Sequence, residues 1–211
     1  MIKIGNTEIT DIRLGSTQIN EVYLGSTQIY GGSLYELCTY IQVTDSSRAY
    51  INTGVSNGSD TEITLDMEIT NPAASARLVG NTSGNFELYL SASLYVSTRT
   101  NNKATNSTIL ADTSRHTYKI NNTEKKAYVD TTSFAFTKNT ATAGTIELFQ
   151  RSSSSGTHVQ AIIYSVQIKN GNTLVRNYVP ARNTVTGKYG MLDQVNNVFY
   201  ASSNSSDFSG G

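Results

Sequence analysis

Apolar and polar residues alternate along several stretches of the chain, most regularly from Asp60 to Thr70. Every second residue there is apolar, beginning at Ile63 and ending at Ile69, and the alternate, polar positions include the carboxylates Glu62, Asp66 and Glu68. A period of two places alternate side chains on opposite faces of a β-strand. The stretch is therefore predicted to be a strand with one face in a core and the other toward solvent.

Further alternating stretches follow one another, and none has a convincing helical period. They comprise residues 86–96, 116–120, 126–129, 145–149, 159–168 and 174–179. The segment Asn170-Gly171-Asn172 before the last stretch is predicted to close a hairpin through a type I′ turn, because Asn-Gly favours that turn. About a dozen strands predict an all-β fold, a two-sheet antiparallel β-sandwich that is either a jelly roll or a related sandwich.

The first thirty residues repeat with a period of ten. Copies begin at Ile4, Leu14 and Leu24, and each continues with Gly-(Asn/Ser)-Thr-(Glu/Gln)-Ile. Each Gly-(Asn/Ser)-Thr is predicted to be a tight turn, since Gly tolerates a positive φ and the polar side chain can bond the nearby backbone. Between two turns, the segment from Gln18 to Leu24 is predicted to be a strand.

Three such units bury too little apolar surface to be stable alone. The repeats are therefore expected to associate with further copies of the chain, a trimer being favoured, or with a groove on another protein. A β-meander packed on the main domain is the alternative. Gly31-Gly32-Ser33 is predicted to be a flexible joint, which divides the chain into a repeat segment, residues 1–33, and a sandwich domain, residues 34–211. The residues expected to make the assembly contact are Ile4, Ile9, Ile12, Leu14, Ile19, Val22, Leu24 and Ile29.

Composition narrows the classes of function. Asn, Ser and Thr make up 73 of the 211 residues, charged residues make up 15%, and the formal net charge is zero. A nucleic-acid-binding protein would show a basic patch, so no nucleic-acid partner is expected. No run approaches the roughly 18 consecutive apolar residues of a membrane helix, and the N-terminus lacks the apolar region of a secretory signal. We therefore expect no membrane insertion, and folding in the cytoplasm of the producing cell.

The C-terminal part of the chain carries a resemblance to a known kind of domain. The closing part of laminin-G-like, concanavalin-A-like domains of phage structural proteins is resembled by residues 163–182, which include the Asn170-Gly171 step. The resemblance to these domains is strongest in residues 187–200. Residues 49–54 resemble their opening strand pair, although Asn52 stands where such sequences often carry Asp, so an ion site using that carboxylate is not implied. The Leu-Gly-Ser-Thr repeats are similar to the start of some phage virion proteins. The resemblance covers about residues 40 to 208 and implies a sandwich fold, a virion setting, and binding of glycans or other proteins.

Glycosidases of the concanavalin-like fold need two carboxylates across the scissile bond, and those that hydrolyse β-glucans carry Glu-x-Asp-x-Glu. Here Thr64 replaces the first Glu before Asp66 and Glu68. Glu62 lies about 13 Å from Asp66 along an extended strand. The motif is incomplete, so these carboxylates are predicted to form a solvated outer face.

Other reactive residues offer no catalytic pattern. His116 and His158 lie far apart and match no known triad order, so they are predicted to be ordinary strand-end residues. Cys38 falls in an apolar alternation and is predicted to be a small buried side chain. No cofactor and no His/Cys metal cluster is expected, while calcium bound by loop oxygens would leave no motif.

The function expected is that of a non-enzymatic phage structural protein, a head or tail fibre or decoration protein located in the virion. Residues 1–30 would dock on other virion proteins or form the trimer, and the sandwich would contact glycans of the host surface or the environment. Thirteen Tyr and the many Asn could build a sugar site without Trp, and the loop from Arg151 to Gly156 either faces a ligand or is inert. The alternatives are a virion adaptor without a ligand and a polysaccharide depolymerase.

Overall fold

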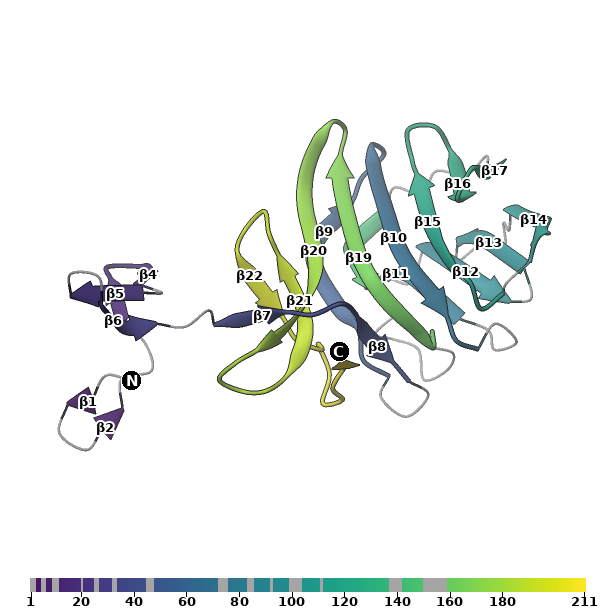
Figure 1. The fold of residues 1–211 in the computed structure, drawn as a ribbon. Helices are drawn as coiled ribbons and strands as arrows, with labels where there is room; N and C mark the ends of the chain where they lie inside the picture. The colour runs from purple at the N-terminus through teal and green to yellow at the C-terminus, as the bar shows by residue number, and fades with distance from the viewer. Residues whose placement is uncertain are drawn as a thin grey trace.

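The computed structural model of the 211-residue chain describes fourteen ranges of residues. They are 3–4, 7–8, 12–19, 21–24, 27–31, 34–44, 48–71, 76–82, 86–91, 93–98, 104–110, 112–136, 142–149 and 159–211. Within these ranges all regular structure is β-strand, which confirms the all-β prediction (Figure 1).

Eleven strands form the larger sheet, and all of its pairs are antiparallel. Its main path runs in the order β17 (Thr132–Ala135), β16 (Lys126–Val129), β15 (Arg115–Asn121), β10 (Thr61–Ile69), β19 (Ala161–Asn170), β20 (Thr173–Asn183), β21 (Tyr189–Asp193) and β22 (Val198–Tyr200). Three short strands join this path, with β7 (Tyr35–Leu37) beside β20 and β8 (Ile41–Val43) between β19 and β23 (Ser209–Gly210).

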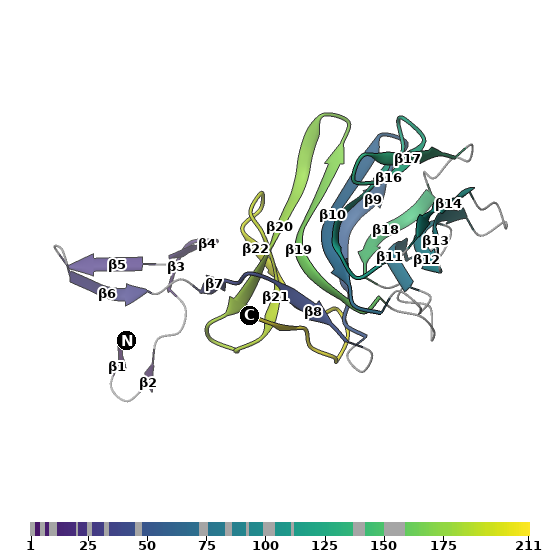
Figure 2. The ribbon, with the colours of Figure 1, turned by 45° about the vertical axis from the view of Figure 1, so that its right-hand side comes forward.

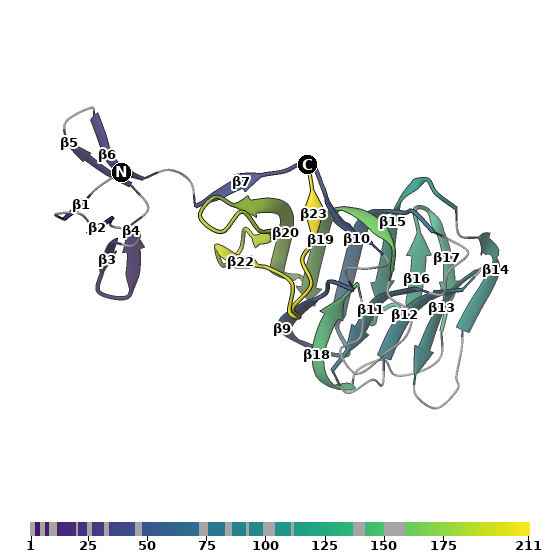
Figure 3. The same ribbon diagram turned by 90° about the horizontal axis from the view of Figure 1, so that it is seen from below.

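The smaller sheet has six described strands, also antiparallel. Their order is β14 (Ala104–Leu110), β13 (Ser93–Thr98), β12 (Phe86–Ser91), β11 (Ala76–Asn81), β18 (Thr142–Leu148) and β9 (Ile51–Asn57). Figures 2 and 3 show the two sheets as facing layers, so the structure is sandwich-like, as predicted.

The core fills the space between the two sheets. In β10, all four apolar residues from Ile63 to Ile69 are fully buried, and the polar residues between them are half-buried, which confirms the predicted two-faced strand. The smaller sheet supplies Ile51 of β9, Leu88 of β12 and Leu148 of β18 to the same cluster. Apolar surface withdrawn from water on both sides of this layer is the main source of stability.

The β19–β20 hairpin forms as predicted, but its turn differs from the predicted one. Asn170 pairs with Thr173, so the two central residues are Gly171 and Asn172 rather than Asn170 and Gly171. Gly171 has a φ of 56°, and Asn172 is not among the residues with a positive φ. A glycine with positive φ at only the first central position is typical of type II′, not type I′.

The alternating stretch 86–96 is not one strand but parts of two. β12 and β13 pair with each other, with Leu90 opposite Leu94 and Leu88 opposite Val96. Apolar residues face apolar residues across this hairpin, so the period of two continues through the reversal of the chain. Alternation alone therefore could not reveal the turn.

The N-terminal repeats form three separate two-stranded hairpins (purple in Figure 1). These are β1 (Lys3–Ile4) with β2 (Thr7–Glu8), β3 (Ile12–Leu14) with β4 (Thr17–Ile19), and β5 (Glu21–Leu24) with β6 (Thr27–Gly31). Gly15 has a φ of 64° in the turn between β3 and β4, which confirms the predicted turn in that repeat.

The predicted strand from Gln18 to Leu24 is wrong, because its two ends belong to different hairpins, β3–β4 and β5–β6. Among the described strands, no hairpin pairs with another hairpin or with the sandwich, so a continuous β-meander is not formed.

Cys38, which directly follows the short strand β7, is half-buried rather than buried as predicted. Its thiol donates to the carbonyl of Glu36, with Sγ 3.6 Å from the oxygen. Partial burial, followed by the charge of Glu36, raises the pKa of this thiol.

Replacement of Leu65, fully buried at the centre of β10, tests the packing between the sheets. We expect Leu65→Ala to lower the free energy of unfolding by about 2–5 kcal/mol, because it removes buried methyl groups and leaves a cavity. Thr64→Ala, on the outer face, should cost about 1 kcal/mol or less. Urea unfolding of both variants provides the measurement, and equal losses would contradict the assignment of the two faces.

Candidate functional site

The outer face of the larger sheet, turned away from the core, carries polar side chains in rows across the strands. One row passes from Tyr128 to Lys119, Thr64, Gln167 and Asn177, residues that are paired in register on β16, β15, β10, β19 and β20. The Gln167 amide donates to Asn177 at 3.2 Å. The face is therefore a broad surface of amide, hydroxyl and charged groups.

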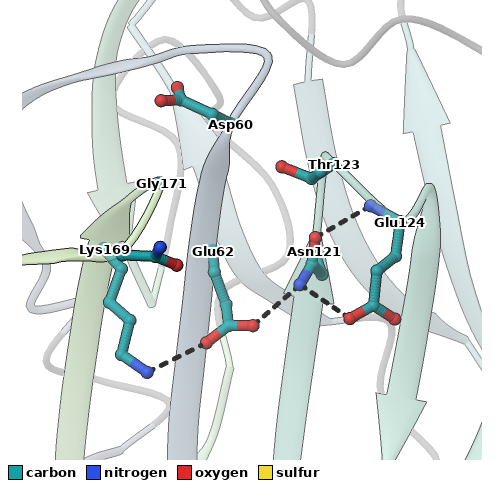
Figure 4. A pocket seen from close by; sticks show the side chains of 8 residues that line it. Asp60, Glu62, Asn121, Thr123, Glu124, Lys169 and Gly171 are labelled. Carbon is teal, nitrogen blue, oxygen red and sulfur yellow. Dashed lines mark hydrogen bonds and ion pairs between the residues drawn. The ribbon is translucent and has the colours of Figure 1, made fainter.

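A pocket of about 400 Å³ opens beside this surface, where β10 begins and β15 ends (Figure 4). The β15–β16 turn and the β19–β20 turn complete its wall. Its lining residues are Asp60, Glu62, Asn121, Thr123, Glu124, Lys169, Gly171 and Asn172.

Asn121 holds two carboxylates of the pocket together. Its Nδ2 donates to Glu62 at 2.8 Å and to Glu124 at 3.2 Å, while its Oδ1 accepts from the backbone N–H of Glu124 at 2.9 Å (Figure 4). An amide that donates to two carboxylates and accepts from a backbone N–H has its orientation fixed.

The carboxylates also have partners around the pocket. Glu62 lies 3.5 Å from the Lys169 ammonium and 3.8 Å from that of Lys119. The Tyr128 hydroxyl donates a short hydrogen bond to Glu124, and this bond is the main reason that the pKa of Tyr128 is raised to about 12. The Lys119 ammonium lies 4.2 Å from the centre of the Tyr128 ring, so it makes a cation–π contact with the same tyrosine.

Hydrogen bonds between the neighbouring turns hold the rim of the pocket. The Thr61 hydroxyl donates to Asn170 at 3.0 Å and accepts from the N–H of Gly58, which links the β9–β10 turn to β19. The N–H of Gly171 donates to the carbonyl of Asp60 at 3.0 Å. The Thr61–Asn170 and Gly171–Asp60 bonds tie chain segments more than 100 residues apart, so the pocket is preformed.

The remaining carboxylates of β10 are engaged further along the same face. Asp66 accepts two hydrogen bonds from Arg115, at 2.7 Å and 2.6 Å. The Arg115 guanidinium lies 3.7 Å from the centre of the Tyr164 ring, and the Tyr164 hydroxyl is 3.5 Å from Glu68. The predicted outer face of carboxylates is confirmed, and its members are ion-paired or hydrogen-bonded.

The structure brings together three of the residues predicted to make the assembly contact. Ile12 lies opposite Ile19 in the β3–β4 hairpin, and Leu14 shares their face because it is two residues from Ile12. Leu14 is 76% exposed, and the two isoleucines are half-buried. Ile4, Val22, Leu24 and Ile29 lie in the other hairpin strands, where only the backbone is described, and Ile9 lies outside the described residues.

Sequence reasoning missed most of the pocket. Of its lining it had singled out only Glu62, as a carboxylate on a strand, and the residues at the β19–β20 turn. Asn121 and Lys169 lie beside Glu62 because β15 and β19 pair with β10. No local sequence pattern predicts that pairing.

Two other expectations fall on residues that the structure does not describe. His158 and the loop from Arg151 to Gly156 both lie outside the described ranges. Within those ranges, no group of three or more His, Cys, Asp or Glu side chains could hold a metal ion. The described part of the chain also contains no helix long and apolar enough to cross a membrane.

No protein-family model matches the chain, and no curated protein matches its sequence. The class that the structure defines is an all-β protein with a sandwich-like pair of antiparallel sheets and three N-terminal hairpins.

His116 forms a second polar cluster near β17, at one end of the larger sheet. Its Nδ1 lies 2.7 Å from Asp130 and its Nε2 lies 3.0 Å from Asp112, and only the protonated ring can donate to both carboxylates. Burial lowers the pKa of His116, but the hydrogen bonds and charges of Asp130 and Asp112 outweigh it, so the pKa is raised. The pKa values of Asp112 and Asp130 are lowered, first by backbone N–H donors and then by His116.

This cluster predicts a pH-dependent stability. The His116 contribution is complete below the unfolded pKa of about 6.5 and is lost as the pH rises through the raised folded value. The carboxylate contributions are present above about pH 4 and are lost as the pH falls through the lowered folded values.

We therefore expect the stability difference between the wild type and His116→Gln to be larger at pH 6 than at pH 8.5. The change should be about 1 kcal/mol or less, because both aspartates are half exposed to solvent. Urea unfolding at the two pH values measures it. A difference independent of pH would contradict the charged state of His116.

Proposed function

We propose that the chain is a non-enzymatic structural protein of a bacteriophage virion, a head or tail fibre or a decoration protein. Residues 1–33 attach it to other virion proteins and to further copies of itself. Residues 34–211 form a laminin-G-like, concanavalin-A-like jelly roll that presents a glycan-binding surface. Support comes from the sequence resemblance, the uncovered hairpin face and the preformed polar pocket.

The apolar face of the β3–β4 hairpin is the observation that carries the proposal. Ile12, Leu14 and Ile19 lie together on it, and Leu14 is largely exposed. A two-stranded hairpin has no second layer with which to bury such a face and is marginally stable by itself. Further copies of the chain supply identical faces, and a closed trimer would bring three of them together around one axis. Among the closed assemblies that would bury this face, we propose the trimer.

The glycan part of the proposal is supported by the chemistry of the pocket and its surroundings. Amide, carboxylate and ammonium groups converge there, and such groups exchange hydrogen bonds with sugar hydroxyls. The rim is held by bonds between turns, so little entropy is lost when a ligand is bound.

The non-enzymatic part is supported by the state of the β10 carboxylates. Both oxygens of Asp66 accept from Arg115, and Thr64 stands where a hydrolase of this fold would carry its first Glu. A glycosidase needs one carboxylic acid and one free carboxylate across the bond. The paired Asp66 is unsuited to either role.

The assembly proposal predicts the mass of a hairpin variant. In solution the wild type should be an oligomer of the 22.9 kDa chain, and the triple variant Ile12→Asn, Leu14→Asn, Ile19→Asn should be a monomer. Polar side chains on that face remove the gain from burying it. Arg13→Gln, on the opposite face of the same hairpin, should leave the oligomer intact. Light scattering after gel filtration measures the masses, and a monomeric wild type or an oligomeric triple variant would refute the proposal.

The sandwich proposal predicts binding without cleavage. On an array of bacterial surface polysaccharides and oligosaccharides, the full-length protein should give specific signals and release no reducing sugar. Silence across the array would favour the adaptor without a ligand. Release of reducing sugar that is lost in Asp66→Asn would favour the depolymerase.

A further inference from the structure

The pocket of Figure 4 has an excess of hydrogen-bond acceptors and of negative charge. Its lining supplies three carboxylates, two amides and one ammonium group, from Asp60, Glu62, Glu124, Asn121, Asn172 and Lys169.

Only one of the three carboxylates is compensated. Glu62 faces the ammonium groups of Lys169 and Lys119. Among the described residues, neither Asp60 nor Glu124 forms an ion pair with a Lys or Arg side chain. Three carboxylates against one ammonium group give the lining an excess of negative charge at short range, which attracts cations and repels anions.

We infer that this pocket binds one sugar residue that carries no negative charge, either a neutral hexose or a hexosamine with a free amine, and that it excludes acidic sugars. The inference rests on the proposed glycan-binding function and assigns that function a site and a ligand class. A volume of about 400 Å³ lies within the range of small-molecule sites.

The arrangement of the side chains gives each part of such a sugar a partner. Hydroxyl groups donate to the carboxylates of Asp60 and Glu124, and the Lys169 ammonium donates to a ring or hydroxyl oxygen. An ammonium group on the sugar meets the uncompensated carboxylates and gains a charge-assisted hydrogen bond. A sugar carboxylate at the same place faces like charges and leaves acceptors without donors.

The test compares the full-length wild type with the double variant Asp60→Asn, Glu124→Gln. The probes are β-linked oligosaccharides of glucose, glucosamine and glucuronic acid, together with an array of other neutral, amine-bearing and acidic glycans, at pH 6 and low ionic strength. The wild type should bind its best neutral or amine-bearing glycan at least about tenfold more tightly than any acidic one. In the double variant this ratio should fall to about threefold or less, because two repulsive charges are gone.

Two further variants separate the pocket from the rest of the outer face. Among the described lining residues Lys169 is the only cation, so Lys169→Gln should weaken binding of the neutral glycan several-fold and weaken acidic glycans further. Glu68→Gln removes a carboxylate from the same face of β10, about 20 Å further along the strand, and should leave the ratio unchanged. Thermal unfolding confirms that each variant is folded; Asp60 and Glu124 are exposed, so their replacement leaves the core untouched.

Each outcome decides a different point. A ratio that falls in the double variant and persists in Glu68→Gln supports the inference. Acidic glycans that bind as tightly as neutral ones, or a ratio indifferent to the double variant, overturn the inference and leave a glycan-binding function located elsewhere. Absence of binding to every probe overturns the inference together with the glycan-binding function.

Discussion

β10 is hydrogen-bonded on both sides, to β15 and to β19, and a shift of one residue in its register would turn both of its faces over. The shift would move Glu62, Asp66 and Glu68 into the core, where an unpaired carboxylate costs several kcal/mol, and would expose four apolar side chains. The sequence of β10 thus determines how its neighbours lie beside it. Asn121 and Lys169 reach Glu62 as a consequence of the same register that buries Leu65.

This constraint explains what could be predicted from the sequence. Burial alternates along a strand, so the alternation of apolar and polar residues predicts the two faces of β10 and the positions of most strands. The pairing of strands depends on residues far apart in the chain, and the pocket depends on that pairing. The sequence alone therefore could not predict that Asn121 and Lys169 lie beside Glu62. The hairpin of β12 and β13 shows the same limit, because apolar residues lie opposite apolar residues and the alternation passes through the turn unchanged.

The type of a turn is a second feature that the sequence alone predicts incompletely. At the β19–β20 turn, Asn-Gly favoured a type I′ turn centred on both residues, yet the strands pair so that Gly171 comes first. Further from the turn, Val166 is paired with Tyr178, and both are fully buried. A register shift between Ile168 and Lys169 then brings Asn170 opposite Thr173, which leaves Gly171 and Asn172 as the two central residues of the turn. In the β3–β4 hairpin, by contrast, Leu14 is 76% exposed, and the chain reverses at the Gly-Ser turn, where Gly15 has a φ of 64°.

The carboxylates of β10 lie on one face of one strand, yet their hydrogen-bonding and ion-pair partners differ. Asp66 meets the fork of a guanidinium, which occupies both oxygens in a planar pair and leaves little capacity for a ligand. Glu62 meets ammonium groups at 3.5 Å and 3.8 Å and a single amide donor, so lone pairs are left for another donor. Asp66 lies in the middle of the strand, within reach of Arg115, which β15 pairs with Glu68. Glu62 lies at the end of the strand, where the turns open a space. The capacity to bind a ligand therefore follows from the position along β10, although the residue type is nearly the same.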